Sequence, residues 1–426
     1  MIARRAQTAD GLVPAGTPAS VDRTTPVRTV YDVTDWHVPG EHLDPRTDIG
    51  AVINSIITDI KRQQPDQVDK PGAVVYIPPG TYSLRTRVVV DVSYLCIRGS
   101  GHGFASLSIR YNSGNTSAWH EVNPGGSHIR VENTDGHSEA FLVTRGGAPR
   151  LSSIEFENFC LDGVSFGPDQ NSYRNGKIGI RVATANDSVR VRGMGMVYLQ
   201  QGVIVQDADA LDISGNFLAE CGSCIELTGS GQTTKVTDNL IGAGPIGFSI
   251  FAEGHNGLLV SGNNIFPRGK DSLHLKNCYR SNISSNRFHS FYPGMLTLEG
   301  NSKENLIGSN MFERQVETYG PFIGVGNGLG DDFGVVQING DGNTIMGNHV
   351  TLLIPPEQVS PAGVTPAIFR VVAGDQNFIG TNHVISNLDV KTVVLDIGTT
   401  NSHVFDSGTE NQFLANSSSY GFRPTP

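Results

Sequence analysis

Apolar residues recur at helical spacing in one segment of the chain. Within residues 49–61 they repeat at intervals of three and four: Ile49, Val52, Ile53, Ile56, Ile57 and Ile60. Asp48 precedes them as a candidate N-cap, so the pattern predicts one amphipathic helix. Elsewhere apolar residues come in short runs, such as residues 73–77, bounded by glycine, proline or asparagine. These runs predict short β-strands joined by tight turns.

A short motif recurs through the middle of the chain. It has an aliphatic residue, two small or polar residues, an asparagine, and another apolar residue close behind. Its asparagines are Asn216, Asn239, Asn263, Asn286 and Asn310, followed by Asn348 and Asn382. The first steps are 23, 24, 23 and 24 residues, and the last two are 38 and 34. A looser copy lies at Phe156-Glu157-Asn158-Phe159.

A period of 23–24 residues with short strands indicates a solenoid. Leucine-rich repeats share this period, but their leucine frame is missing here. We predict an all-β, right-handed parallel β-helix of about a dozen coils, capped at its N-terminal end by the 49–61 helix. The asparagines should lie in turns, adopt left-handed backbone geometry and form a side-chain ladder. Residues 1–45 are expected to form an arm and 46–426 a single domain, with insertions after Asn310 and Asn348.

Composition and charge restrict the classes of ligand that the protein is expected to bind. The net charge is −10 with no basic run, which argues against nucleic acid or an anionic membrane as a partner. No stretch approaches the roughly 18 apolar residues that span a bilayer. Cys221 and Cys224 form a lone C-x-x-C, for which buried structural thiols are the favoured interpretation. We therefore expect a neutral or cationic ligand, no metal and no cofactor.

The N-terminus leaves the location of the protein open. Arg4 and Arg5 are not followed by the apolar stretch of a signal peptide. We expect a cytoplasmic protein if Met1 is the native start, and a secreted one if the chain is a mature form.

The long polar faces of a parallel β-helix suit extended carbohydrate chains, and cleavage of a sugar linkage usually needs two carboxyl groups. The chain has 41 acidic residues. The densest group beside small and cysteine residues comprises Asp207, Asp209, Asp212, Glu220 and Glu226. Spacing alone does not choose among them, and no aspartate cluster supports the Ca²⁺-dependent chemistry of a polyuronate lyase.

Several segments resemble known proteins. The start of the chain, at residues 48–53 and 75–82, resembles the pectate-lyase-like β-helix superfamily. Four further segments are similar to inulin fructotransferases: 171–177 (NSYRNGK), 208–222 (ADALDISGNFLAECG), 264–269 (NIFPRG) and 287–294 (RFHSFYPG). The resemblance runs from about Val30 to Pro426.

The resemblance implies a homotrimer that releases the terminal difructose of inulin as a cyclic dianhydride, or a relative that hydrolyses that dianhydride. The family's catalytic Asp and Glu stand eleven residues apart, and Asp209 and Glu220 match this spacing and its motif. Eleven residues is about half a coil, so we expect the two carboxylates on different faces of one solenoid. They would meet only across a subunit boundary, which agrees with the family's trimer.

The implied reaction is intramolecular. A hydroxyl of the terminal fructose attacks C2 of its neighbour while O1 of the third sugar leaves, with one carboxyl as acid and the other as base. Attack by O3 would give difructose dianhydride III (DFA III) and attack by O1 would give DFA I. The family favours DFA III.

Further residues of the matching segments are candidate sugar contacts: Arg174, Asn175, Arg268, His289 and Tyr292. The glycine-rich insertion around Val316–Asp332 is a candidate lid whose deletion should affect turnover more than folding. Two alternatives stay open beside the transferase. One is a DFA III hydrolase that gives inulobiose, and the other is a non-catalytic carbohydrate-binding solenoid.

Overall fold

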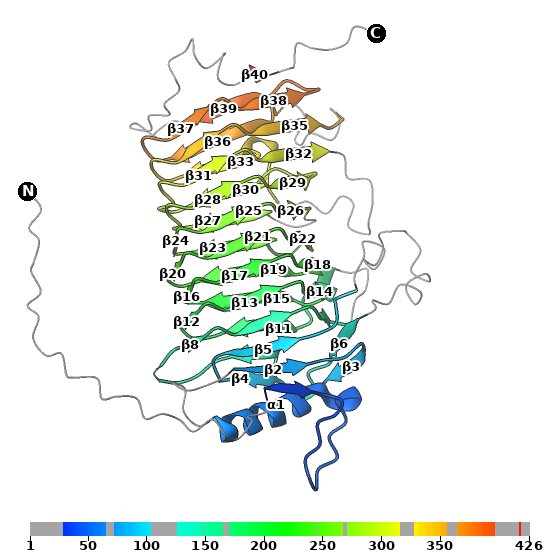
Figure 1. Ribbon diagram of the computed structural model, residues 1–426. Coiled ribbons are helices and arrows are strands. Elements are labelled where there is room, and N and C mark those ends of the chain that lie inside the picture. Colours follow the sequence, from blue (N-terminus) through cyan, green and yellow to red (C-terminus); the bar gives the residue numbers. More distant parts are fainter. Residues whose placement is uncertain are drawn as a thin grey trace, which may run out of the picture.

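The computed structural model describes residues 29–396, apart from 65–71, 104–125, 148, 165–169, 245, 267–270, 316–327 and 356–363, together with residues 417–418. Successive turns of the chain stack along one axis into a tall solenoid, with the helix α1 (Pro45–Gln63) at its N-terminal end (Figure 1). The strands form four sheets, here named A to D. Each full coil passes through sheets C, D, A and B in turn, or through C, A and B where sheet D is missing.

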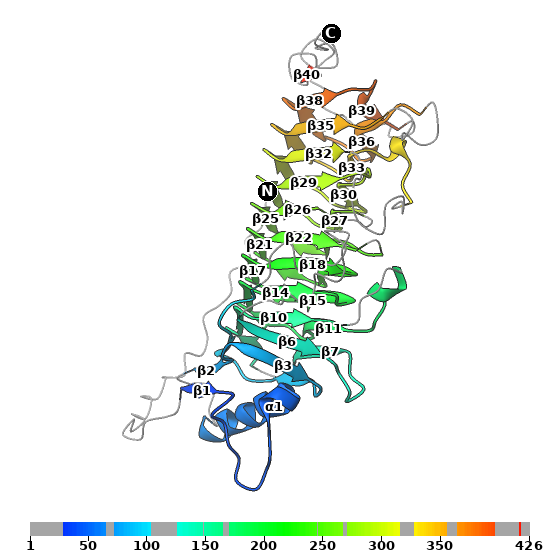
Figure 2. The ribbon, with the colours of Figure 1, turned by 90° about the vertical axis from the view of Figure 1, so that its right-hand side faces the viewer.

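Sheets A and B contain twelve strands each. Sheet A consists of β1 (Val30–Asp32), β2 (Ala73–Tyr76), β5 (Leu95–Arg98), β9 (Glu155–Glu157), β13 (Arg190–Arg192), β17 (Asp212–Ser214), β21 (Lys235–Thr237), β25 (Leu259–Ser261), β28 (Asn282–Ser284), β31 (Leu306–Gly308), β34 (Thr344–Met346) and β37 (Phe378–Gly380). Sheet B, which faces the viewer in Figure 2, consists of β3 (Gly80–Leu84), β6 (Ser127–Val131), β10 (Cys160–Asp162), β14 (Gly195–Val197), β18 (Phe217–Cys221), β22 (Leu240–Ala243), β26 (Asn264–Ile265), β29 (Arg287–Ser290), β32 (Met311–Gln315), β35 (His349–Leu353), β38 (His383–Ser386) and β40 (Ser417–Ser418).

Sheets C and D complete the coils with eleven and five strands. Sheet C consists of β4 (Val88–Val90), β7 (Glu139–Val143), β11 (Ile178–Val182), β15 (Gln201–Gln206), β19 (Ser223–Thr228), β23 (Ile250–Glu253), β27 (Leu273–Lys276), β30 (Leu296–Glu299), β33 (Val336–Asn339), β36 (Ala367–Ala373) and β39 (Lys391–Leu395). Sheet D consists of β8 (Leu151–Ser152), β12 (Asn186–Asp187), β16 (Ala208–Asp209), β20 (Gly231–Gln232) and β24 (His255–Asn256).

The strands pair in parallel and in register from coil to coil, which places like residues in columns. Val191, Ile213 and Val236 are register partners in sheet A, and each is completely buried. Such columns form one continuous apolar core along the axis. The predicted all-β, right-handed parallel β-helix of about a dozen coils is confirmed.

The helix α1 caps the open end of this core, as predicted. It packs against β3 and β4 and buries its isoleucine face. Its first turn begins earlier than expected, because Asp44 caps the backbone N–H of Arg46. The backbone then breaks at Asp48, whose carboxylate accepts the N–H of Gly50 at 3.1 Å. Asp48 therefore caps the main helix after a short leading turn.

The folded unit also starts earlier than residue 46. Strand β1 lies within the segment expected to be an arm, and it pairs in parallel with β2, Val30 opposite Val74. The end of the arm thus contributes the first strand of sheet A. Residues 1–28 lie outside the described residues.

The asparagine ladder is present and fully buried. The side-chain amide of Asn216 donates to the Oδ1 of Asn239 at 2.8 Å, and Asn239 donates in the same way to Asn263 at 2.9 Å. The series continues through Asn286, Asn310, Asn348 and Asn382. The axial alignment inferred from the spacing is therefore confirmed.

One detail of the ladder differs from expectation. The left-handed backbone lies one residue before each asparagine, for example at Gly215 (φ 65°) and Asp238 (φ 58°). This turn residue lets the asparagine that follows it point inward, where its amide also bonds to a backbone carbonyl of the preceding coil. A second ladder, at the turns leading into sheet A, joins Asn305, Asn343 and Asn377.

Breaking the ladder should destabilise the fold. Asn263 donates to Asn286 and to the carbonyl of Val236, and its Oδ1 accepts from the backbone and side chain of Asn239. Because Asn263→Ala leaves buried polar groups unpaired, we expect it to lower the free energy of unfolding by about 3 kcal/mol in denaturant titrations. The matched control is Asn282→Ala, at an exposed position outside the ladder. Equal stability of the two variants would contradict the role of the ladder.

The two long steps of the repeat correspond to insertions at one corner. Both lie between a strand of sheet B and the next strand of sheet C, after β32 and after β35. Most of the candidate lid, residues 316–327, lies outside the described residues. Its described end contains a 3₁₀ turn, Asp331–Phe333. Asp331 forms a buried ion pair with Arg314 of β32, so deletion of the whole insertion should also disturb folding, contrary to our expectation from its composition.

Candidate active site

Glu220 lies in an irregular part of sheet B. Strand β18 shifts register against β22 between Ala219 and Cys221, and Glu220 between them has a left-handed backbone with φ 52°. Leu218 and Cys221 belong to the core inside the solenoid. Strict alternation would also turn residue 220 inward, so the bulge directs the Glu220 side chain out of the core. Glu220 has this left-handed backbone inside a strand, whereas the other left-handed non-glycine residues of the described chain lie outside the strands.

Glu220 is 4% exposed, and its carboxylate accepts a hydrogen bond from the hydroxyl of Tyr173. Tyr173 ends the 3₁₀ turn Gln170–Tyr173, in the connection between β10 and β11. Its ring lies so close to Gly244 that a Cβ at residue 244 would be 2.3 Å from a ring carbon. Gly244 therefore leaves the space in which Tyr173 reaches the carboxylate of Glu220.

The loop that carries Tyr173 is fastened to the neighbouring coil. Asn175 donates to the carbonyl of Tyr198 at 2.7 Å and accepts the N–H of Lys177 at 3.0 Å. Arg174, beside it, is exposed. Of these two sugar-contact candidates, Asn175 positions the loop around Glu220, and Arg174 presents its side chain at the surface next to that loop.

Asp209 lies in β16 of sheet D, on the other side of the coil. Arg150 bridges its carboxylate and that of Asp187, at 2.7 Å from each. Asp187 and Asp209 are register partners, and the side chain of Asp209 is 35% exposed. The arrangement is an open, charged surface that faces away from the core.

The other acids of the dense region have structural partners. Asp207 has φ 51° and accepts the N–H of Ser230 in the next coil. Asp212 is paired with Arg192, and this partner holds the pKa of Asp212 below its usual value although burial acts in the opposite direction. Glu226 accepts a hydrogen bond from Gln201.

Asp209 and Glu220 are not brought together within one chain. They belong to different sheets, β16 and β18, on opposite sides of the solenoid in Figure 1. The predicted separation of the two carboxylates is therefore confirmed. A single reacting bond cannot contact both of them in an isolated chain.

The remaining sugar-contact candidates lie elsewhere along the axis. His289 is in β29, three strands from β18 in sheet B, and burial lowers its pKa. Tyr292 follows that strand and packs edge-on against Phe291. These residues are not part of the Glu220 cluster. Arg268 lies outside the described residues.

Sheet B carries an apolar patch beside Glu220. Val197, Tyr198, Phe217 and Ala219 are buried on its outer side, with Leu240 and Phe266 packed against them. Cys221 and Cys224 lie in the core instead and are completely buried, as expected for structural thiols. Within the described residues, no helix is long and apolar enough to cross a membrane.

Sequence patterns missed two residues of these sites. Tyr173 lies in a loop, 47 residues before its partner Glu220, and Arg150 precedes Asp209 by 59 residues. Neither belongs to the repeat, so the period of the solenoid gives no signal for them. Their contacts arise from the stacking of the coils.

Comparison with known proteins assigns the family. The protein-family model "Beta helix repeat of Inulin fructotransferase" matches residues 309–426. The family model of the periplasmic copper-binding protein NosD matches residues 150–321. An inulin fructotransferase [DFA-I-forming] of Arthrobacter globiformis is 49% identical over 404 residues, which are 93% of this chain and 99% of that protein.

Solved structures support the same family assignment. The DFA-IIIase of Arthrobacter chlorophenolicus A6 in complex with GF2 has a TM-score of 0.84 at 46% identity, over 94% of this chain and 100% of that one. The same enzyme without its lid, also with GF2, has a TM-score of 0.84 at 49% identity and the same coverage. A mannuronan C-5 epimerase module of Azotobacter vinelandii, 13% identical with a TM-score of 0.52, shares the fold alone. On this relationship over nearly its whole length, the chain belongs to the inulin fructotransferase family.

Proposed function

We propose that this protein is an inulin fructotransferase, which releases a difructose dianhydride from the end of β-2,1-linked fructan. The observation that carries the proposal is the 49% identity with such an enzyme along 99% of its length. The attacking hydroxyl belongs to the substrate itself, so its tether to the reacting carbon supplies a high effective concentration. The protein then has to supply an acid, a base and a binding surface.

Asp209 and Glu220 supply the acid and the base in this proposal. One carboxyl protonates O1 of the departing sugar, and the other removes the proton from the attacking hydroxyl. Because the two residues lie on different sides of one solenoid, Asp209 of one subunit would face Glu220 of the next in a homotrimer. The exposure of the Asp187–Arg150–Asp209 surface is compatible with such an interface.

The product we propose is DFA I. The relative from Arthrobacter globiformis forms DFA I, which favours attack by O1 of the terminal fructose over the attack by O3 expected from the family alone. The two hydroxyls belong to the same sugar, so a small change in the walls of the site decides which one lies in line with C2. The alternative orientation, with O3 in line with C2, would give DFA III.

Hydrolysis of DFA III is the second candidate. It is favoured by the DFA-IIIase structures, one of which is in complex with DFA-III at 47% identity. In that case the same carboxyls would activate water and the dianhydride would be the substrate.

Incubation with inulin distinguishes these functions. We expect a cyclic dianhydride in which long-range carbon–proton correlations join C2 of each fructose to H1 of the other. A correlation from one C2 to H3 of the other fructose would show DFA III instead. Cleavage of DFA III to inulobiose without release of a dianhydride from inulin would establish the hydrolase, and no reaction with either substrate would leave a carbohydrate-binding solenoid.

A further inference from the structure

A pocket of about 300 Å³ opens on the outer face of sheet C, around β27, β30 and β33. One wall is apolar and the other polar. Its lining includes Phe248, Leu329 and Phe333 on the apolar side, and Asp271, His274, Thr297, Glu299, Gln337 and Asn339 on the polar side. We call it the His274 pocket.

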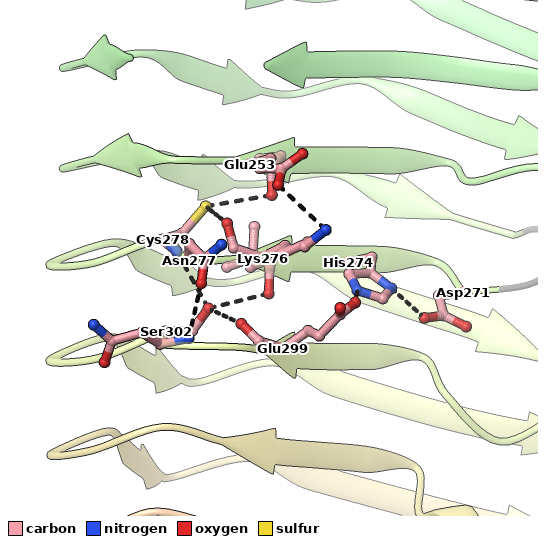
Figure 3. A network of polar contacts seen from close by, with 11 residues as sticks. Glu253, Asp271, His274, Lys276, Asn277, Cys278, Glu299 and Ser302 are labelled. Carbon is pink, nitrogen blue, oxygen red and sulfur yellow. Dashed lines mark hydrogen bonds and ion pairs between the residues drawn. The ribbon is translucent and has the colours of Figure 1, made fainter. Parts of the chain in front are cut away.

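His274 holds the polar wall together (Figure 3). Its Nδ1 lies 2.7 Å from Oδ2 of Asp271, and its Nε2 lies 2.7 Å from Oε2 of Glu299. Burial opposes a positive charge on the ring, but the hydrogen bonds and charges of the two carboxylates raise the pKa of His274 above its usual value. Each carboxylate uses one oxygen on His274, which leaves Oδ1 of Asp271 and Oε1 of Glu299 as acceptors for a ligand.

Thr297 supplies an unused polar group. It is the register partner of His274 on the next strand and is 3% exposed. Within the described part of the chain, its hydroxyl oxygen has no hydrogen-bond partner. An unpaired buried hydroxyl costs about 1–3 kcal/mol, which a ligand hydroxyl could recover. Gln337 follows Thr297 in the same column and adds an amide.

The apolar wall completes a site for a neutral sugar. The ring of Phe248 lies 5.3 Å from that of His274, and Phe333 also lines the pocket. Aromatic and aliphatic side chains can cover the C–H face of a sugar while carboxylate, amide and hydroxyl groups bind its hydroxyls. Two carboxylates disfavour a phosphorylated or otherwise anionic ligand.

The pocket lies on the same side of the solenoid as Glu220. Glu220 is the second-to-last residue of β18, and β19 follows this strand directly into sheet C. Strands β27 and β30 are two and three positions from β19 in that sheet, which is about 10–15 Å along the axis. A sugar in the pocket would therefore lie beyond the bond that reacts at Glu220.

We propose that the His274 pocket binds a non-reacting fructosyl unit of a long fructan whose end lies at Glu220. This inference rests on the proposed function, because it takes fructan as the substrate. In this proposal, Thr297 and the two carboxylates that contact His274 give the enzyme its preference for long fructan chains.

Thr297→Val tests the proposal, because valine keeps the shape of threonine and removes a hydroxyl that has no hydrogen-bond partner among the described residues. We compare long inulin with a three-unit fructan, the shortest chain with a terminal pair and a leaving sugar. The ratio of KM for long inulin to KM for the short chain should rise about tenfold. Thr344→Val, in sheet A and away from the pocket, should leave the ratio unchanged.

Direct binding separates this inference from the proposed function. In the Glu220→Gln background, Thr297→Val should weaken binding of long inulin about tenfold in equilibrium titrations. If Thr297→Val weakens binding of long inulin but the wild type forms no dianhydride, the pocket is a fructan-binding site and the proposed transferase activity is refuted. Dianhydride formation with an unchanged KM ratio and unchanged binding would refute the pocket as a fructan site.

Discussion

We expect the replacement of Glu220 with glutamine to lower the turnover of inulin by at least ~10², the effect of removing an acid or base. The substitution is close to isosteric. The amide oxygen of glutamine can still accept the hydroxyl of Tyr173, so the loop 170–177 and the space beside Gly244 should be unchanged. What is lost is the ability of residue 220 to take up or release a proton.

The matched control is Glu226→Gln. Glu226 lies in β19, the strand that follows Glu220, and it bonds to Gln201. This variant makes the same chemical change in the neighbouring strand, and it should keep turnover near that of the wild type. The melting temperature of both variants should stay within a few degrees of the wild type. Wild-type turnover in Glu220→Gln would remove Glu220 from the mechanism.

The architecture of this protein could be predicted because the repeat is a direct physical consequence of stacking. From Asn216 onward each coil presents an asparagine to the next at the same turn, so a regular interval of 23–24 residues is visible in the sequence. The second ladder could have been found in the same way. Asn305, Asn343 and Asn377 are separated by 38 and 34 residues, the same steps as Asn310, Asn348 and Asn382.

The details of the site could not be predicted in this way. The bulge at Glu220 depends on the register of β18 against β22, and a one-residue shift leaves no trace in a local pattern. Tyr173 and Arg150 reach their carboxylate partners from distant loops, and Asp271, His274 and Glu299 meet only because β27 and β30 pair in register. The tertiary fold brings such groups together from distant segments, whereas the repeat is a local sequence pattern within the coils.

A mixture of two inactive variants should recover activity if the catalytic pair spans two subunits. Asp209→Asn removes one carboxyl, and Arg150 keeps Asp187 as an ion-pair partner, so the surface should stay folded. Alone, this variant should lose at least ~10² in turnover, like Glu220→Gln. In a mixed cyclic trimer, one of the interfaces joins an intact Asp209 to an intact Glu220. Random mixing should therefore restore about one quarter of wild-type activity.

The experiment requires dissociation, mixing and reassembly, with mixed trimers verified by mass spectrometry of differently tagged subunits. The control mixes Asp209→Asn subunits with subunits that carry both Asp209→Asn and Glu220→Gln. No interface in those trimers has both carboxyls, so activity should not return. If verified trimers of the two single variants also stay inactive, both residues act within one subunit. That outcome would require Asp209 and Glu220 to reach one bond from the separate sheets β16 and β18, and it would overturn the interfacial site.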